Sequence, residues 1–271
     1  MITAIRSGRT GRRSDNVAGV DTAAALIAEN AAFAELMRGA DMSIQVPTCP
    51  EWSVEQLMRH LGRGDRWCAQ IVAEQSADAI DPRTVAGGKP PQGGEIEWLL
   101  DGPGLLLDAV KRTGAQTNVW TFLGPRPAQW WIRRRLHETA VHRADAALAL
   151  GAEFTIAPDI AADGITEYLE RTVIRANAEG PAGGDRPLAE GLSLHLHATD
   201  PGLGAAGEWT ILGRPDGIAF DHEHAKATVA LRGPARDLLL AVVRRADAAE
   251  LGLEVFGDQA VWDTWLARTP F

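Results

Sequence analysis

The chain has 271 residues, of which 45% are hydrophobic and 23% are charged, the balance of an ordinary globular protein. Its 36 acidic residues outnumber its 27 basic residues and give a formal net charge of −9. This composition excludes collagen-like, coiled-coil and largely disordered proteins, and the negative charge argues against general nucleic-acid binding. The length suits two domains.

The start of the chain carries a local excess of positive charge. Four arginines gather there among Ser, Gly and Thr: Arg6, Arg9, Arg12 and Arg13. Because no apolar run follows them, we expect residues 1–17 to form a flexible basic arm and not an export signal. No stretch approaches the roughly 18 apolar residues of a membrane span. These features predict a soluble, cytoplasmic protein without a membrane partner.

The first half of the chain is predicted to be helical. Apolar residues recur at helical spacing in four segments: residues 20–39, 54–75, 95–112 and 127–149. Ser53 is the expected N-cap of the second helix, and Gly151 is expected to end the fourth. The two prolines of VPTCPEWS (46–53) predict a loop, as do the many Pro and Gly residues of 76–94. Four helices in this length are typical of a helical bundle.

The second half shows a different pattern. A helix over 158–176 and the connector EGPAGGDRP (179–187) precede short alternating segments. The predicted strands are residues 192–198, 208–213, 217–221 and 227–233. Further helices are expected over 235–247 and 258–268, with the short segment LEVFG between them. We therefore predict an α+β protein, with a four-helix bundle over 18–155 and a smaller domain with an antiparallel sheet over 156–271.

Tryptophan and cysteine are distributed unevenly. The chain has nine Trp beside a single Tyr. Six of these tryptophans fall in the predicted bundle: Trp52, Trp67, Trp98, Trp120, Trp130 and Trp131. They predict a large aromatic core or an aromatic-lined cleft. The two cysteines, Cys49 and Cys68, lack the spacing of redox or zinc motifs and are expected to be reduced structural thiols.

Three residues of the predicted bundle form a candidate metal site. Glu138 and His142 are separated by four positions on one helix and project from the same face. His60 lies on another helix, beside Leu57 and Leu61, which directs it toward the bundle interior. Two imidazoles and one carboxylate are the ligands of a catalytic zinc site with one open position. From spacing alone, an exposed Glu–His pair and a packed, hydrogen-bonded core histidine are more common explanations of these residues than a metal site.

Several motifs resemble one known family, in order along the chain. The segments VPTCPEWSVEQLMRHLG (46–62) and LHETAVHRADAALALG (136–151) resemble the two signatures of the first domain of the mycothiol-dependent maleylpyruvate isomerase family. IAADGITEYL (160–169) is similar to the linker helix of that family. HLHATDPGLGAAGEWTI, VALRGPARDLLLAVVRR and LEVFGD are similar to its carboxy-terminal domain. The resemblance covers about residues 20–268.

The resemblance implies a fold, a metal and a thiol cofactor. The first domain of the family is similar to DinB-like metal-binding bundles. Carried onto this chain, the metal ligands of the family are His60, Glu138 and His142. Zn²⁺ is the expected ion, although such ligands also accept nickel, cobalt or iron. The implied cofactor is mycothiol, and the implied partner is a small electrophilic molecule.

Cationic residues are expected to contact substrate or cofactor. The resemblance implies a catalytic arginine from the second domain, for which Arg244 and Arg245 are the candidates. Arg83, with Lys89 as the alternative, is expected to supply a cofactor-binding contact from the loop 76–94. The competing interpretation for each is a surface cation.

The remaining histidines have structural explanations. His137 points about a hundred degrees away from Glu138 around the helix, and a packing role is expected. His195 and His197 alternate on one strand and share a face, but no third ligand is apparent near them in the sequence. His222 and His224 lie in the acidic turn DHEHAK and are expected to be solvated. Asp145 either orients a ligand histidine or pairs with Arg143 or a neighbouring helix.

The function implied by the resemblance is mycothiol-dependent catalysis. A metal ion with an open position lowers the pKa of a bound thiol and favours the nucleophilic thiolate. Addition and loss of the thiol at a cis double bond would isomerise a maleylpyruvate-like substrate, whereas addition alone would make the enzyme an S-transferase. Two alternatives stay open, which are a thiol-independent metal-dependent hydrolase and a non-catalytic metal- or ligand-binding regulatory protein.

Overall fold

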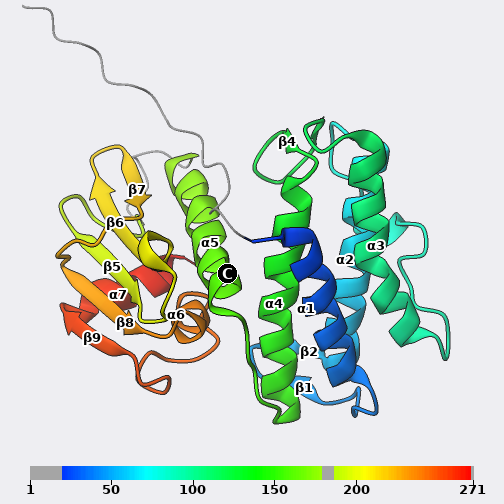
Figure 1. Cartoon of the computed structure of the whole chain (residues 1–271), viewed down its shortest axis with the longest axis horizontal. Coiled ribbons are helices and arrows are strands. Elements are labelled where there is room, and N and C mark those ends of the chain that lie inside the picture. The colour runs from blue at the N-terminus through cyan, green and yellow to red at the C-terminus, as the bar shows by residue number, and fades with distance from the viewer. Residues whose placement is uncertain (1–19, 179–185, 270–271) are drawn as a thin grey trace, which may run out of the picture.

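The computed structural model describes residues 20–178 and 186–269, which form a helical lobe beside an α+β lobe (Figure 1). The predicted arm at 1–17 and most of the predicted connector at 179–187 lie outside these described residues. The α+β class predicted from the sequence is confirmed. Among the described residues, no helix combines the length and the apolar character that a membrane crossing requires.

Four long helices build the first lobe. They are α1 (Thr22–Met37), α2 (Val54–Ala73), α3 (Glu95–Thr113) and α4 (Trp130–Leu150). Ser53 caps α2 as predicted, because its hydroxyl accepts from the backbone N–H of Gln56 while the Gln56 side chain accepts from the N–H of Ser53. α4 ends at Gly151, whose φ of 63° is a left-handed conformation that glycine adopts without strain.

The predicted loop at 46–53 is wrong in part, because it contains a small hairpin. β1 (Gln45–Val46) pairs antiparallel with β2 (Cys49–Ser53). Pro50 is tolerated in this hairpin because each strand of a two-stranded ladder has one free edge, where a missing N–H costs nothing. Short elements also interrupt the later loops of the bundle: η1 (Pro82–Thr84), β3 (Asn118–Val119) and β4 (Arg126–Pro127).

Tryptophans fill the bundle core, as predicted. The rings of Trp67, Trp120 and Trp131 contact one another with centroids 5.4 to 6.3 Å apart. Trp98 packs between α2 and α3 against Gly62, where an added Cβ would lie 2.1 Å from the indole ring. Glycine at this position therefore lets α3 approach α2 closely.

The second lobe consists of a five-stranded sheet with helices. Its elements are α5 (Pro158–Ala178), β5 (Ser193–Ala198), η2 (Gly204–Gly207), β6 (Glu208–Arg214), β7 (Gly217–Asp221), β8 (Val229–Gly233), α6 (Ala235–Val242), β9 (Glu254–Gly257) and α7 (Gln259–Arg268). The strand order is β7-β6-β5-β8-β9. The sheet is mostly antiparallel as predicted, but β5 and β8 run parallel. The loop 222–228 connects β7, at one edge, to β8 on the other side of β5 and β6. The loop leads the chain back, so β8 runs in the same direction as β5.

The two faces of this sheet differ in chemistry. Leu194, Leu196 and Trp209 are fully buried in a core shared with α5, α6 and α7. The alternate residues face the other way, because side chains along a strand alternate between faces. His197 and Glu208 are directly paired across β5 and β6 on this second face.

Helix α6 is shorter than the predicted helix at 235–247. It ends at Val242, and Arg244 has a left-handed φ of 58°. The backbone N–H of Arg245 donates to the carbonyl of Leu240 at 2.8 Å, which closes the helix end. This turn directs the side chain of Arg245 across to the bundle.

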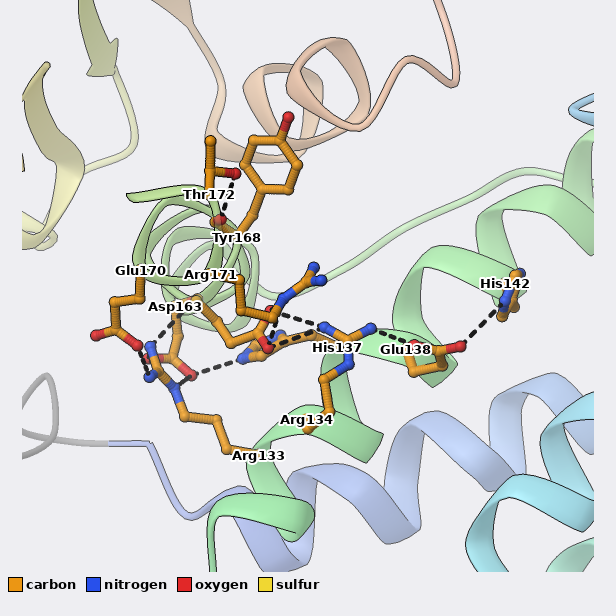
Figure 2. A network of polar contacts seen from close by, with 11 residues as sticks. Arg133, Arg134, His137, Glu138, His142, Asp163, Tyr168, Glu170, Arg171 and Thr172 are labelled. Atoms are coloured by element: carbon orange, nitrogen blue, oxygen red, sulfur yellow. Dashed lines mark hydrogen bonds and ion pairs between the residues drawn. The ribbon is translucent and has the colours of Figure 1, made fainter. Parts of the chain in front are cut away.

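Buried ion pairs join α4 of the bundle to α5 of the second lobe (Figure 2). Arg133 binds Asp163 at 2.8 Å and Glu170 at 2.7 Å, and Arg134 binds Glu167 at 2.8 Å. His137, on the same helix, binds Asp163 at 2.7 Å. The packing role predicted for His137 is thus an inter-lobe contact, and the neighbouring Glu138 belongs to the same polar network.

Candidate metal centre

Three metal-binding side chains converge from two helices of the bundle. His60 comes from α2, and Glu138 and His142 come from α4. Glu138 Oε1 lies 3.0 Å from His60 Nε2 and 3.5 Å from His142 Nε2. One ligand atom from each residue lies within 4.8 Å of the other two. The structure therefore brings together the three residues that the sequence analysis selected.

Helix periodicity and the hairpin position these side chains. Glu138 and His142 are neighbours on α4 because residues four apart share a helix face. The ring of Trp52, from β2, packs against His60 with centroids 4.8 Å apart, and the two imidazoles lie 5.0 Å apart. The unexpected hairpin therefore supplies one wall of the cluster.

Asp145 orients His142. Its carboxylate lies 2.8 Å from His142 Nδ1, and because a carboxylate only accepts, Nδ1 carries the proton and Nε2 faces Glu138. Thr48 donates to the same carboxylate at 2.6 Å, and Arg245 binds it at 2.8 Å. Burial alone would raise the pKa of Asp145, but His142 and Arg245 outweigh it and lower that pKa to about 2. Asp145 thus contacts a candidate ligand and not Arg143, which pairs with Glu29.

The charges around the cluster favour a cation at its centre. Burial alone would raise the pKa of Glu138, but Arg134 and the two imidazoles hold it well below its ordinary value. Burial opposes charge on His142 as well, yet Asp145 and Glu138 raise its pKa above the ordinary value. His60 has a lowered pKa, chiefly because it is buried. The carboxylate of Glu138 therefore lies between two imidazoles whose pKa values are shifted in opposite directions.

A pocket opens beside the cluster. Its volume is about 530 Å³, which lies in the usual range for small-molecule sites. His60 and Glu138 line it together with the aromatic rings of Trp52, Trp67, Trp131 and Phe122. Both predicted uses of tryptophan are present, since the same rings build the core and line a cleft.

Arginines on α2 and α4 also line the pocket, and the sequence analysis missed them. They are Arg59, Arg63, Arg134 and Arg135. Arg134 and Arg135 are bound to buried carboxylates, whereas Arg59 pairs with the exposed Glu55 and Arg63 donates to the carbonyl of Gly88. The available signal was helix spacing, because residues 59 and 63 flank His60 on one face of α2.

The predicted cationic residues lie elsewhere. Arg83 is 84% exposed and binds Asp81 at 2.8 Å, and Arg244 donates to the carbonyl of Leu266 at 3.3 Å. Arg245 binds Asp145, the residue that contacts His142. Lys89 lines a separate hollow of about 500 Å³ between α2 and α3.

Both cysteines are free thiols with raised pKa values. Burial raises the pKa of Cys49, which lies beside His142 and Asp145. Burial also raises the pKa of Cys68, well above its ordinary value. A raised pKa disfavours the thiolate, which fits the structural role expected for both residues.

The comparisons with known proteins cover both lobes. The mycothiol maleylpyruvate isomerase N-terminal domain matches residues 23–147, and the MDMPI C-terminal domain matches residues 159–264. No curated protein matches this chain significantly.

A solved structure shares the fold of this chain. The crystal structure of a histidine-to-alanine mutant of the mycothiol-dependent maleylpyruvate isomerase aligns with a TM-score of 0.54 at 14% identity, over 83% of this chain and 89% of that one. A second crystal structure of that isomerase gives a TM-score of 0.49 at 14% identity, over 84% and 90%. Because both family domains match in order along the sequence, this chain belongs to the mycothiol maleylpyruvate isomerase family.

Proposed function

We propose that this chain is a metal-dependent enzyme that activates mycothiol for addition to an electrophilic small molecule. With a cis double bond in the substrate, addition and loss of the thiol gives a maleylpyruvate-type isomerase. With other electrophiles, addition alone gives an S-transferase. The observation that carries the proposal is the convergence of His60, Glu138 and His142 beside a pocket of about 530 Å³.

The residues present suit a divalent metal ion. Two imidazole nitrogens and a carboxylate oxygen are a common catalytic zinc set, and they leave a position for an external ligand. Nickel, cobalt and iron accept the same donors. His60, Glu138 and His142 would hold the ion. When bound, it would lower the pKa of a thiol at that open position.

Neighbouring residues keep the donors in their binding states. Asp145 keeps the proton of His142 on Nδ1, so Nε2 is available as a donor. Arg134 keeps Glu138 ionised from the side facing α5. A histidine whose other nitrogen is hydrogen-bonded to a carboxylate is a stronger and better oriented ligand. These contacts support preorganised binding.

The pocket lining supports an anionic substrate. Arg59 and Arg63 present guanidinium groups that can bind carboxylates in two-pronged fashion. Trp52, Trp67 and Phe122 offer flat apolar walls for a conjugated molecule. A small unsaturated carboxylate combines both properties. We include a cytoplasmic location in the proposal, because Cys49 and Cys68 are both free thiols.

The proposal is tested by thiol dependence. The full-length protein, loaded with Zn²⁺ or stripped by a chelator, is assayed with unsaturated dicarboxylates with and without mycothiol. We expect turnover only when both metal and mycothiol are present, and loss of turnover in His142→Ala. Glu35→Gln, an exposed carboxylate variant on α1, is the matched control and should keep full activity.

Product analysis then separates isomerisation from S-transfer. A trans isomer with mycothiol recovered identifies an isomerase, and a stable conjugate identifies an S-transferase. Ester hydrolysis that is independent of thiol would contradict the proposal in favour of a hydrolase. Tight ligand binding without any product would contradict it in favour of a regulatory protein.

A further inference from the structure

A second histidine–carboxylate cluster lies in the α+β lobe, outside the bundle. Glu208 of β6 accepts from three imidazoles. His195 Nε2 lies 2.8 Å from Oε2, and His197 Nδ1 and His224 Nδ1 lie 2.7 and 3.1 Å from Oε1. The ligand atoms of His195, Glu208 and His224 all lie within 4.8 Å of one another.

The sheet register builds this cluster. His195 and His197 share a face of β5, and Glu208 is the cross-strand partner of His197. This is the face opposite the apolar core of the lobe. No third partner of His195 and His197 is apparent near them in the sequence, and the structure supplies one, Glu208, from the neighbouring strand.

The loop 222–228 brings the last donor to the sheet. His222 Nδ1 donates to the carbonyl of Glu208 at 2.9 Å, and Thr210 donates to the carbonyl of Glu223 at 2.7 Å. These contacts hold the loop backbone against β6 independently of His224. His224 is therefore not simply a solvated residue of an acidic turn, although its side chain is 70% exposed.

We propose that His195, Glu208 and His224 form a second divalent transition-metal site, of the zinc class, which fastens the loop 222–228 onto β5 and β6. Two imidazoles and a carboxylate match the donor preference of Zn²⁺, and water at the exposed side of His224 completes the coordination. His197 orients Glu208 through the bond to Oε1. Arg232 of β8 is the cross-strand neighbour of His197. Its guanidinium binds Glu254 at 2.5 Å and not the carboxylate of Glu208.

Zinc stoichiometry tests this site separately from the bundle. The full-length Glu138→Ala, His142→Ala variant is stripped with a chelator, reloaded with Zn²⁺ alone, and its metal content is measured by mass spectrometry. We expect one zinc per chain in this variant. Zero zinc would overturn the proposal, whatever the bundle cluster does in the unaltered chain.

Single substitutions in that background test the individual donors. His224→Ala, at a largely exposed position, should weaken zinc binding by at least about 100-fold in a competition titration with a zinc-binding dye. This loss is larger than the loss that removing an outer contact causes. His197→Ala should weaken zinc binding about 10- to 100-fold. Lys226→Ala, at an exposed position of the same loop, is the matched control and should leave zinc affinity unchanged. Equal affinity in His224→Ala and Lys226→Ala would overturn the assignment.

Amide hydrogen exchange in the loop 222–228 distinguishes a metal site from a cluster that is held by hydrogen bonds alone, because only a metal site responds to added zinc. Zn²⁺ should slow amide hydrogen exchange in residues 222–228 of the Glu138→Ala, His142→Ala variant. The slowing should disappear when His224→Ala is added. Unchanged exchange on adding zinc would contradict the fastening role.

Discussion

The bundle cluster (His60, Glu138 and His142) and the sheet cluster (His195, Glu208 and His224) present the same donor types in different surroundings. The bundle donors come from two helices and line a pocket with arginines and aromatic rings. The sheet donors come from paired strands and a loop, and His224 is largely exposed. Both donor sets suit the same class of metal ion, so the pocket beside the bundle cluster and the loop beside the sheet cluster are the features that would separate a reactive site from a supporting one.

Removing the carboxylate from each cluster should give the largest contrast. Glu138→Gln should lower kcat/KM of the thiol-dependent reaction at least about 1000-fold, about 4 kcal/mol, because the only anionic donor of the bundle cluster is lost. Glu208→Gln should lose zinc from the sheet cluster while kcat/KM is unchanged. Steady-state kinetics and metal analysis of both variants measure this contrast. Similar losses of activity in the two variants would contradict the different roles assigned to the two clusters.

The ion pairs between the lobes should affect stability and not donor chemistry. Asp163→Asn should destabilise the protein by about 3 kcal/mol at pH 7, because it removes the shared partner of Arg133 and His137. Burial opposes ionisation of Asp163, but His137 and Arg133 lower its pKa below the ordinary value of 3.8. The ionised carboxylate therefore stabilises the fold above that value, and the stabilisation is lost as pH falls through the lower folded pKa.

Denaturant unfolding from pH 7 downward measures this difference. The gap in unfolding free energy between the unaltered chain and Asp163→Asn should narrow below about pH 4. Zinc bound by the sheet cluster should be the same in both proteins at pH 7. A gap that stays constant with pH would contradict the assigned role of Asp163.

A smaller effect is expected from the residue that orients His142. Asp145→Asn should reduce zinc affinity of the bundle cluster by about 10- to 100-fold, because the amide no longer selects the Nδ1 proton of His142. The measurement is a zinc competition titration in a Glu208→Gln background, which leaves only the bundle ion to be counted. Unaltered affinity would show that Asp145 serves its contacts with Thr48 and Arg245 and not the metal site.

The smallest effect is expected from Arg63, which lines the pocket beside the bundle cluster. Arg63→Met should raise KM for an anionic electrophile by about 10-fold with little change in kcat, and should leave KM for a neutral electrophile unaltered. Arg112→Met, on the exposed last turn of α3, is the matched control. Equal changes for anionic and neutral substrates would exclude recognition of charge by Arg63.

Local sequence determined much of the bundle cluster. The four helices, the N-cap at Ser53 and the stop at Gly151 follow from short-range patterns, and the bounds deviate by a few residues. Glu138 and His142 were recognisable because helix geometry places residues four apart on one face. His60 could be added to this pair because its apolar neighbours, Leu57 and Leu61, indicate that this face of the second helix points toward the bundle interior.

Contacts between segments that are distant in the sequence depend on the tertiary structure. Glu208 reaches His195 through strand register, and Arg245 reaches Asp145 through the left-handed turn after α6, across 100 positions of the chain. The parallel pairing of β5 and β8 arises in the same way from a long return of the chain. A sequence pattern specifies which residues share a face of one helix or strand. Which residues of two different elements contact each other depends on strand register and packing, and a short stretch of sequence does not encode these.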